Sequence, residues 1–334
     1  MQMGTLTKQV MGILRRNGLE TVAQAGQIIQ QAAYDRGVVG DALHFYAQAV
    51  LPNVLPLFPA LIHLSAKTAD ANPKDTTATA VAMLLISASG DIHDDIVDNS
   101  TEKFGKQTLV GKFGKNVALL AGDALLTQGL TLLQHACSRL PSQHRRLISD
   151  LVAASMYEII KAETTESALW HKKNVTPQEY FGVIELKGGV AELHCRIGGL
   201  IGGGTQKKVD SLGRIGRAIG VLSTLKEEFV DLSNPKELLH RLKHELPPYP
   251  MICAMQEEET KNQIEAIAGK MDLSVKDMEL VAKLVLDSFR VKNLEAEFRK
   301  YGQKEMENNE LLKNKNASEL KLLLKALSYE LTLV

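Results

Sequence analysis

The amino-acid sequence predicts an all-α protein, and three observations carry that prediction. Hydrophobic residues recur at helical period along nearly the whole chain of 334 residues, and no segment alternates between apolar and polar residues as a half-buried strand does. Hydrophobic residues make up 45% of the chain while aromatic residues make up only 5%, which favours helices because strands are enriched in aromatic and β-branched side chains. Thr176-Pro177-Gln178-Glu179 forms a capping box, a strong signal for a helix start. We therefore expect one domain over residues 1–334, a bundle of roughly a dozen helices.

Apolar periodicity and the residues that interrupt it define the expected elements. The first helical stretch is expected to break near Asn17-Gly18, and the second to be irregular around Pro52, Pro56 and Pro59. In chain order, the expected helical stretches with two defined ends are 5–33, 42–66, 115–140, 142–169, 207–232, 257–308 and 316–332. Two further helices are expected, one between a loop at 71–75 and residue 99 and one that starts at residue 177. A glycine-containing loop is expected between residues 99 and 115.

The overall composition excludes several classes of function. Lys plus Arg and Asp plus Glu both number 39, so the net charge is zero, which argues against nucleic acid or an anionic membrane as the main partner. No apolar run reaches the ~18 residues that a membrane-spanning helix needs, and residues 1–16 lack the order of a signal peptide. Cys137, Cys195 and Cys253 form no CxxC pair, so we expect reduced, buried thiols in a cytoplasmic protein. The glycine-rich segment 198–204 does not follow a strand, so close packing or a turn explains it better than nucleotide binding.

The most informative local feature is an acidic helix end. Asp91, Asp94, Asp95 and Asp98 have offsets of 0, +3, +4 and +7, which places them on one face of a helix. Four like charges on one stripe repel one another unless cations offset them, and oxygen ligands without a nearby Cys suit a hard cation such as Mg²⁺. The apolar run at 80–86 indicates that this helix is buried before it turns acidic, as in the wall of a cavity. A solvated acidic helix end is the alternative interpretation.

A second acidic cluster favours metal binding over that alternative. Glu227, Glu228 and Asp231 repeat the spacing of the last three aspartates, and they too follow an apolar helical run. Two copies of one acid spacing are difficult to assign to chance surface charge. If the two clusters face each other, they could hold several Mg²⁺ ions and bind a diphosphate between them.

The two clusters, the helical pattern and the segment Leu119-Leu120-Ala121-Gly122-Asp123-Ala124-Leu125-Leu126 together resemble the trans-prenyl diphosphate synthases, such as farnesyl and geranylgeranyl diphosphate synthases. The resemblance extends over residues 40–250. It implies the isoprenoid-synthase fold around a central cavity, a homodimer, and three bound Mg²⁺ ions, with Mn²⁺ as a substitute. It also implies the reaction: diphosphate leaves an allylic diphosphate, and the double bond of isopentenyl diphosphate attacks the carbocation.

The resemblance also implies which residues act. The segment from Asp94 to Asp98, preceded by His93, matches the first aspartate-rich motif, and the segment from Glu227 to Asp231 matches the second, with Glu for Asp at two positions. Lys187 matches a lysine that contacts the allylic diphosphate. Small residues stand at Ser89 and Gly90, where bulky aromatics stop chain growth in the family; they imply a product of twenty carbons or more, and close helix packing is the alternative. The expected metal ligands are Asp94, Asp95, Asp98, Glu227, Glu228 and Asp231; the expected catalytic groups are Asp94, Asp95 and Lys187; the expected substrate contacts are Lys103, Lys187, Lys243, Ser89 and Gly90.

Several positions depart from the family pattern, chiefly where isopentenyl diphosphate is expected to bind. Residues 54–59 supply no cation where the family has Gly-Lys-Arg-x-Arg-Pro, and the Arg-Arg pair after the first motif becomes Lys103-Phe104. Ser87, Gly188 and Ser223-Thr224 stand in place of a His, a Thr and a Phe-Gln. Because charge-assisted hydrogen bonds contribute about 1.5–3 kcal/mol each, the loss of cations should weaken a diphosphate site.

Three functions are compatible with this pattern. The first, which we favour, is a Mg²⁺-dependent prenyltransferase that condenses isopentenyl diphosphate with an allylic diphosphate. The second is an enzyme of the same fold that ionises an allylic diphosphate but uses another acceptor or cyclises the product, as terpene synthases do; the lost cations favour it. The third is a non-catalytic subunit that tunes a homologous synthase; the accumulated substitutions favour it, whereas the intact first acidic motif argues against it.

Overall fold

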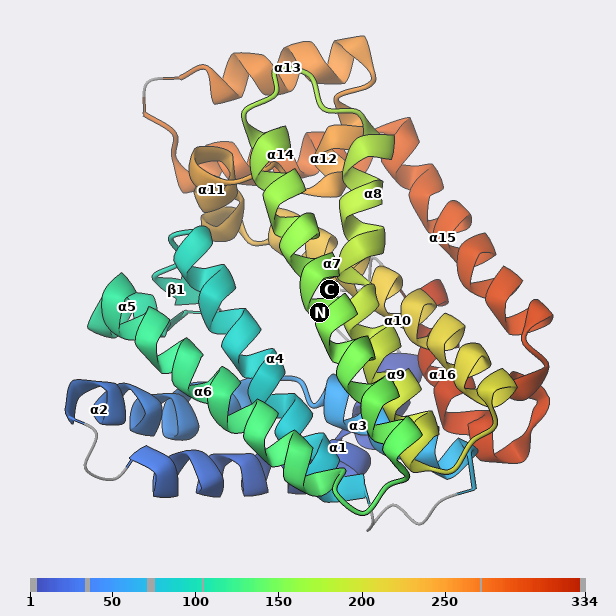
Figure 1. The fold of residues 1–334 in the computed structure, drawn as a ribbon. Helices are drawn as coiled ribbons and strands as arrows, with labels where there is room; N and C mark the ends of the chain where they lie inside the picture. The colour runs from blue at the N-terminus through green and yellow to red at the C-terminus, as the bar shows by residue number, and fades with distance from the viewer. Residues whose placement is uncertain (1–4, 34–36, 71–75, 104, 271, 331–334) are drawn as a thin grey trace. The chain divides into compact units, whose positions relative to one another are not determined.

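The computed structural model describes residues 5–33, 37–70, 76–103, 105–270 and 272–330, so the loop expected at 71–75 lies outside the described residues. The described residues fold almost entirely into helices (Figure 1), which confirms the predicted all-α class. Contacts divide the chain into two compact units. Unit 1 comprises Met1–Val10, Leu151–Leu193 and Asp210–Val334, and unit 2 comprises Met11–Asp150 and His194–Val209. One domain over residues 1–334 stays a prediction.

Two long helices, α4 (Thr77–Val97) and α6 (Lys115–Ala136), form the centre of unit 2 and run side by side (Figure 1). Glycine permits their close approach, because a Cβ on Gly129 would lie 2.8 Å from Ile86 Cγ1 and 3.0 Å from the Ala82 carbonyl oxygen. Their apolar faces share one core with the helices before them. The other elements that lie wholly or largely in unit 2 are α1 (Thr5–Ala33), α2 (Gly37–Phe45), a π-helical turn (Tyr46–Val50), a 3₁₀ turn (Leu51–Asn53), α3 (Leu57–Thr68), β1 (Glu102–Lys103), β2 (Lys106–Gln107) and α5 (Leu109–Phe113).

The first helix is continuous, so the predicted break near Asn17-Gly18 is wrong. A Cβ on Gly18 would lie 2.6 Å from the Cβ of Pro56, which shows that this glycine permits tight packing rather than ending the helix. The Asn17 side chain donates to the Ile13 carbonyl at 2.8 Å and so bonds within the helix. The predicted irregularity is confirmed at Pro52, in the 3₁₀ turn that follows the π-helical turn, and at Pro56, which precedes α3 as its N-cap residue. It is wrong at Pro59, which lies in the first turn of α3.

The loop between the acidic helix and α6 contains a two-stranded ladder that the sequence did not predict. Glu102 pairs with Gln107 and Lys103 with Lys106 in antiparallel register. Strands of two residues are too short to show alternation, so periodicity could not reveal them. The ladder matters because it fixes the backbone of Lys103.

One described helix, α6, is long and apolar enough to cross a membrane, and the bent pair Gly37–Asn53 and Leu57–Thr68 would count as a second such segment. The helix is not an uninterrupted apolar run, because Asn116, Asp123 and Gln128 lie within it. The helix meets the criterion with a mean hydropathy of 1.3 because its few polar residues are scattered among Leu, Ala and Gly. Core helices of globular proteins have the same composition, and α6 packs along α4.

In unit 1, the predicted capping box starts α8 (Pro177–Lys187), since Thr176 Oγ1 accepts from the Glu179 N–H and the Glu179 carboxylate accepts from the Thr176 N–H. The helices α15 (Phe289–Asn308) and α16 (Ser318–Tyr329) pack against each other. The predicted burial of the three cysteines is confirmed, and none is in a disulfide. The other elements that lie wholly or largely in unit 1 are α7 (Ser142–Trp170), α10 (Gln206–Ser233), α11 (Pro235–His244), α12 (Tyr249–Ala254), α13 (Glu258–Ala268), α14 (Val275–Asp287) and 3₁₀ turns at Glu310–Lys313 and Lys315–Ala317. The helix α9 (Gly189–Ile201) has residues 189–193 in unit 1 and residues 194–201 in unit 2, and α1, α7 and α10 also contribute residues to both units.

Candidate active site

The first acidic cluster lies at the C-terminal end of α4, where two carboxylates converge on one cation. Lys103 Nζ lies 2.7 Å from Asp95 Oδ1 and 3.4 Å from Asp94 Oδ2. The Asp95 side chain is buried, whereas Lys103 keeps 39% of its side chain exposed. Asp98 is the C-cap residue of the helix, and its N–H donates to the Asp94 carbonyl. These contacts show that both carboxylates point to a position where a positive charge sits.

The electrostatics of this cluster follow from burial and mutual repulsion. Burial raises the pKa of the Asp95 carboxyl, although the Lys103 ammonium opposes that shift. Burial lowers the pKa of Lys103, but the carboxylates of Asp94 and Asp95 outweigh burial, so the pKa of Lys103 is raised. Lys103 therefore stays charged and offsets the repulsion that the sequence predicted at this helix end.

His93 links the acidic helix to α6. Its Nε2 lies 3.3 Å from Asp123 Oδ1. Gly122 makes room for the imidazole, because a Cβ there would lie 2.6 Å from His93 Nε2. The Ala121-Gly122-Asp123 segment thus has a physical role: glycine admits the ring and the aspartate binds it.

Gly122→Ala is expected to destabilise the protein by about 1–3 kcal/mol, because the added methyl group displaces the His93 ring. Gly90→Ala is the matched control on the neighbouring helix: a Cβ there meets nothing within 4 Å, so a gain of up to about 1 kcal/mol is expected. Chemical denaturation of both variants measures the difference. Equal midpoints for the two variants would contradict this account.

The residues expected to set product length also lie on α4, both about two turns before the end of the helix. Ser89 is buried, and Gly90 is exposed. Because the space around Gly90 is open, close helix packing does not explain the glycine at that position. His194 is buried and stacks on Phe58 with ring centroids 4.7 Å apart, and Ser87 Oγ lies 3.4 Å from its Nε2.

The second acidic cluster lies at the C-terminal end of α10 in unit 1. Glu227 is exposed, Glu228 is buried and Asp231 is partly exposed. Arg241 on α11 contacts two of them: its Nη1 lies 3.0 Å from Glu228 Oε1 and 2.9 Å from Asp231 Oδ2. Arg241 is itself buried, so a fixed guanidinium already offsets part of the charge of this pair of acids.

The remaining predicted site lysines lie at two further places in unit 1. Lys187 ends α8 and pairs with two carboxylates of α7: its Nζ lies 2.5 Å from Glu166 Oε2 and 3.2 Å from Glu163 Oε1. Lys243, on α11, is exposed. The residue of α11 that contacts the second cluster is Arg241, two residues earlier. Its burial identifies it, and burial could not be read from the sequence alone.

Another cation that sequence reasoning missed lies in unit 2. Lys106 on β2 donates to Asn53 Oδ1 at 2.6 Å, which places an ammonium beside residues 54–59, the segment that lacks the family's cations. Phe104, which replaces an arginine, lies outside the described residues.

Among the described residues, no three His, Cys, Asp or Glu side chains are arranged to hold a metal ion as they stand. The first cluster nevertheless suits Mg²⁺, because Asp94 and Asp95 offer hard oxygen ligands that converge on one flexible, partly exposed ammonium. The second cluster does not suit it in the same way, because Glu228 and Asp231 converge on a buried guanidinium. The two predicted metal motifs therefore differ in chemistry.

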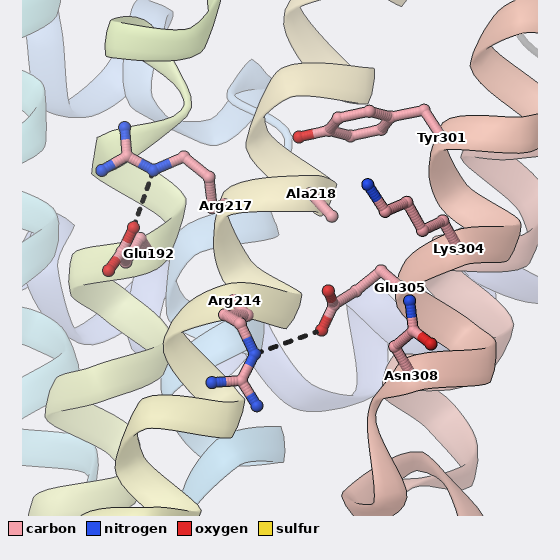
Figure 2. A pocket seen from close by; sticks show the side chains of 8 residues that line it. All are labelled: Glu192, Arg214, Arg217, Ala218, Tyr301, Lys304, Glu305 and Asn308. Atoms are coloured by element: carbon pink, nitrogen blue, oxygen red, sulfur yellow. Dashed lines mark hydrogen bonds and ion pairs between the residues drawn. The ribbon is translucent and has the colours of Figure 1, made fainter.

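A pocket of about 310 Å³ lies in unit 1 (Figure 2). Its charges are largely paired: Arg217 Nε lies 2.7 Å from Glu192 Oε2, and Arg214 Nε lies 3.9 Å from Glu305 Oε1. No residue predicted for the active site lines it. The lining residues are Glu192, Arg214, Arg217, Ala218, Tyr301, Lys304, Glu305 and Asn308.

Comparison with known proteins decides the family. The family model described as polyprenyl synthetase matches residues 56–285, more than half of the chain. The chain belongs to the polyprenyl synthetase family. The match includes both acidic clusters and Lys187. The resemblance inferred from the sequence is thereby confirmed.

Individual members of the polyprenyl synthetase family resemble this chain over different lengths. Geranylgeranyl diphosphate synthase of Methanosarcina mazei is 28% identical over 190 residues, which is 56% of this chain and 57% of that protein. Heptaprenyl diphosphate synthase component 2 of Geobacillus stearothermophilus is 22% identical over 244 residues, 71% of this chain and 73% of that protein. The crystal structure of geranylgeranyl pyrophosphate synthetase from Pyrococcus horikoshii matches with a TM-score of 0.79 and 21% identity, covering 96% of this chain and 98% of that one, which confirms the fold. The chain spans little more than half the length of the first of these relatives.

Proposed function

We propose that this polyprenyl synthetase condenses isopentenyl diphosphate with an allylic diphosphate in a Mg²⁺-dependent reaction and releases a linear prenyl diphosphate. The observation that carries the proposal is the convergence of Asp94 and Asp95 on one cation, within a chain that belongs to this family. Lys103 offsets part of the repulsion between these acids, and a divalent cation in its place would offset more of it. A cluster built to bind a cation explains why the acids are kept close together.

Each group of the proposed site has a definite role. Asp94, Asp95 and Asp98 supply oxygen ligands, and Mg²⁺ held there would stabilise the charge that develops on the leaving diphosphate. A divalent ion bound by Asp94 and Asp95 would take the place of Lys103, whose ammonium would then be available to the diphosphate. Lys187 is proposed to exchange Glu163 and Glu166 for diphosphate oxygens. Apolar surroundings on α4 exclude water from the carbocation.

The second function, ionisation of an allylic diphosphate without isopentenyl diphosphate, is favoured by the absence of cations at 54–59. Diphosphate release from ten-, fifteen- and twenty-carbon allylic diphosphates, measured with and without isopentenyl diphosphate, separates the two. Release that depends on isopentenyl diphosphate supports chain elongation. Release without it supports the second function, and no release in either case with folded protein supports a non-catalytic subunit.

Gly90→Phe is expected to shorten the product by one or more five-carbon units. Gly90 stands four residues before Asp94 on the same face of α4, and the open space around its Cα admits an aromatic ring without a clash. Product chain length by chromatography is the measurement, with Gly182→Phe, another glycine with open space around it, as the control. Unchanged product length in Gly90→Phe would show that this position does not line the path of the growing chain.

We further propose a homodimer in the cytoplasm. The similarity to heptaprenyl diphosphate synthase component 2 makes a heteromer with a homologous chain the alternative. Light scattering on the purified chain distinguishes a dimer from a monomer that awaits another subunit.

A further inference from the structure

The resemblance implies metal ions at both acidic clusters, but the contacts of the second cluster disagree with that expectation. Arg241 is 3% exposed, and each of its nitrogens has an oxygen partner. Nη1 contacts Glu228 and Asp231, Nη2 donates to the Tyr180 hydroxyl at 2.8 Å, and Nε donates to the Leu246 carbonyl at 3.0 Å. A planar guanidinium held by this many directed bonds is fixed in place.

The Glu228 carboxylate is equally committed. Its Oε1 lies 3.0 Å from both Arg241 Nη1 and the Tyr180 hydroxyl, and its Oε2 accepts from the Tyr249 N–H at 2.6 Å. The side chain is buried between α8, α10 and the start of α12. A metal ion could reach this carboxylate only by breaking these hydrogen bonds, which would leave buried donors without an acceptor.

We propose that Arg241 is a resident cation of the second acidic cluster, which takes Glu228 and Asp231 out of metal binding. Both acids then act as counter-ions that hold the end of α10 to α11. Glu227 is the exposed member of the cluster. This inference deepens the proposed function. Its test by Mn²⁺ binding rests on the proposed function, whereas its test by stability in EDTA does not.

The contrast between the two clusters supports the distinction. Lys103 in the first cluster has a flexible stem, keeps 39% of its side chain exposed and contacts the acids through one ammonium. A divalent ion can displace such a group at little cost. Arg241 cannot be displaced in this way, because it is buried and its displacement would leave Glu228 and Asp231 without their cation.

The same contacts extend to Lys187. The Tyr180 hydroxyl lies 3.0 Å from Glu166 Oε1 as well as from Glu228 Oε1, and the other oxygen of Glu166 contacts Lys187 Nζ. These contacts connect Arg241 to Lys187 through Tyr180 and Glu166.

Two adjacent glutamates of one helix give a matched test of stability in EDTA. Metal-binding carboxylates repel one another when the metal ion is absent, so neutralising one of them should stabilise the metal-free protein. If the carboxylates are instead counter-ions of a buried cation, neutralising one of them should destabilise it. Glu228→Gln is expected to lower the melting temperature by about 5 °C or more, whereas Glu227→Gln should change it by about 1 °C or less. Asp231→Asn, at a partly exposed position, is also expected to lower the melting temperature in EDTA. It replaces Glu228→Gln in the test if that variant does not fold.

The same variants are then tested for Mn²⁺ binding in the presence of inorganic diphosphate, with the free ion measured by electron paramagnetic resonance. Glu228→Gln and Asp231→Asn are expected to keep the wild-type Mn²⁺ affinity within about twofold, while Asp94→Asn lowers it by about tenfold or more. Arg241→Gln should acquire a larger Mn²⁺-dependent rise in melting temperature than the wild type, and Arg241→Lys should not.

A rise in melting temperature for Glu228→Gln in EDTA, or a loss of Mn²⁺ affinity as large as that of Asp94→Asn, would overturn the inference. Wild-type protein that binds no Mn²⁺ with diphosphate would instead overturn the proposed function, and the EDTA measurements would still decide the role of Arg241.

Discussion

Replacing Asp94 or Asp95 by Asn is expected to lower the rate of prenyl transfer by about 10²–10³-fold, the largest effect we expect from any single change. Asn keeps the size of the side chain and removes the charge that holds the cation. The loss should appear in kcat/KM for the allylic diphosphate and should be partly relieved by a higher concentration of Mg²⁺, because the remaining carboxylate still binds the ion.

Asp150→Asn is a suitable control for these variants. Asp150 lies on the surface of α7 with a long, exposed ion pair to Arg146 at 3.9 Å, and such pairs contribute little. Its activity is expected to equal that of the wild type. Activity of Asp94→Asn within a few-fold of the control would mean that the first acidic cluster does not bind the catalytic cation.

Lys187→Gln is expected to raise KM for the allylic diphosphate by about tenfold or more, because a charge-assisted bond of about 1.5–3 kcal/mol is lost. The variant also leaves the carboxylates of Glu163 and Glu166 without the ammonium that now bridges them. Lys187→Arg keeps the charge and should retain part of the affinity.

Lys173→Gln, which neutralises an exposed lysine just before α8, controls for the change of net charge. Steady-state kinetics at saturating Mg²⁺ is the measurement. An unchanged KM in Lys187→Gln, with normal thermal stability, would remove Lys187 from the substrate site.

Local signals in the sequence predicted local structure well. The capping box fixed the start of α8 because all of its bonds lie within four consecutive residues. The prediction of a break at Asn17-Gly18 is wrong because Gly18 allows close packing against Pro56, which is distant in the sequence. Helix propensity describes a residue alone, and packing against another element overrides it.

The positions of the acids could also be predicted from the sequence, whereas their partners could not. The spacing of Asp94 and Asp95 places both on one helix face, as observed. Among the basic residues of α11, however, sequence reasoning favoured Lys243 as a substrate contact, while burial selects Arg241 as the partner of the second cluster. Which side of a short helix is buried depends on the elements packed against it, and a ten-residue pattern does not determine that.

The measurement that tests the central claim most directly is product analysis with Mg²⁺, radiolabelled isopentenyl diphosphate and ten-, fifteen- and twenty-carbon allylic diphosphates. Our account predicts label in longer prenyl diphosphates, abolished by EDTA and strongly reduced in Asp94→Asn. No incorporation with any primer by folded protein that still binds Mg²⁺ and diphosphate would contradict it, and would show that this member of the polyprenyl synthetase family no longer elongates prenyl chains.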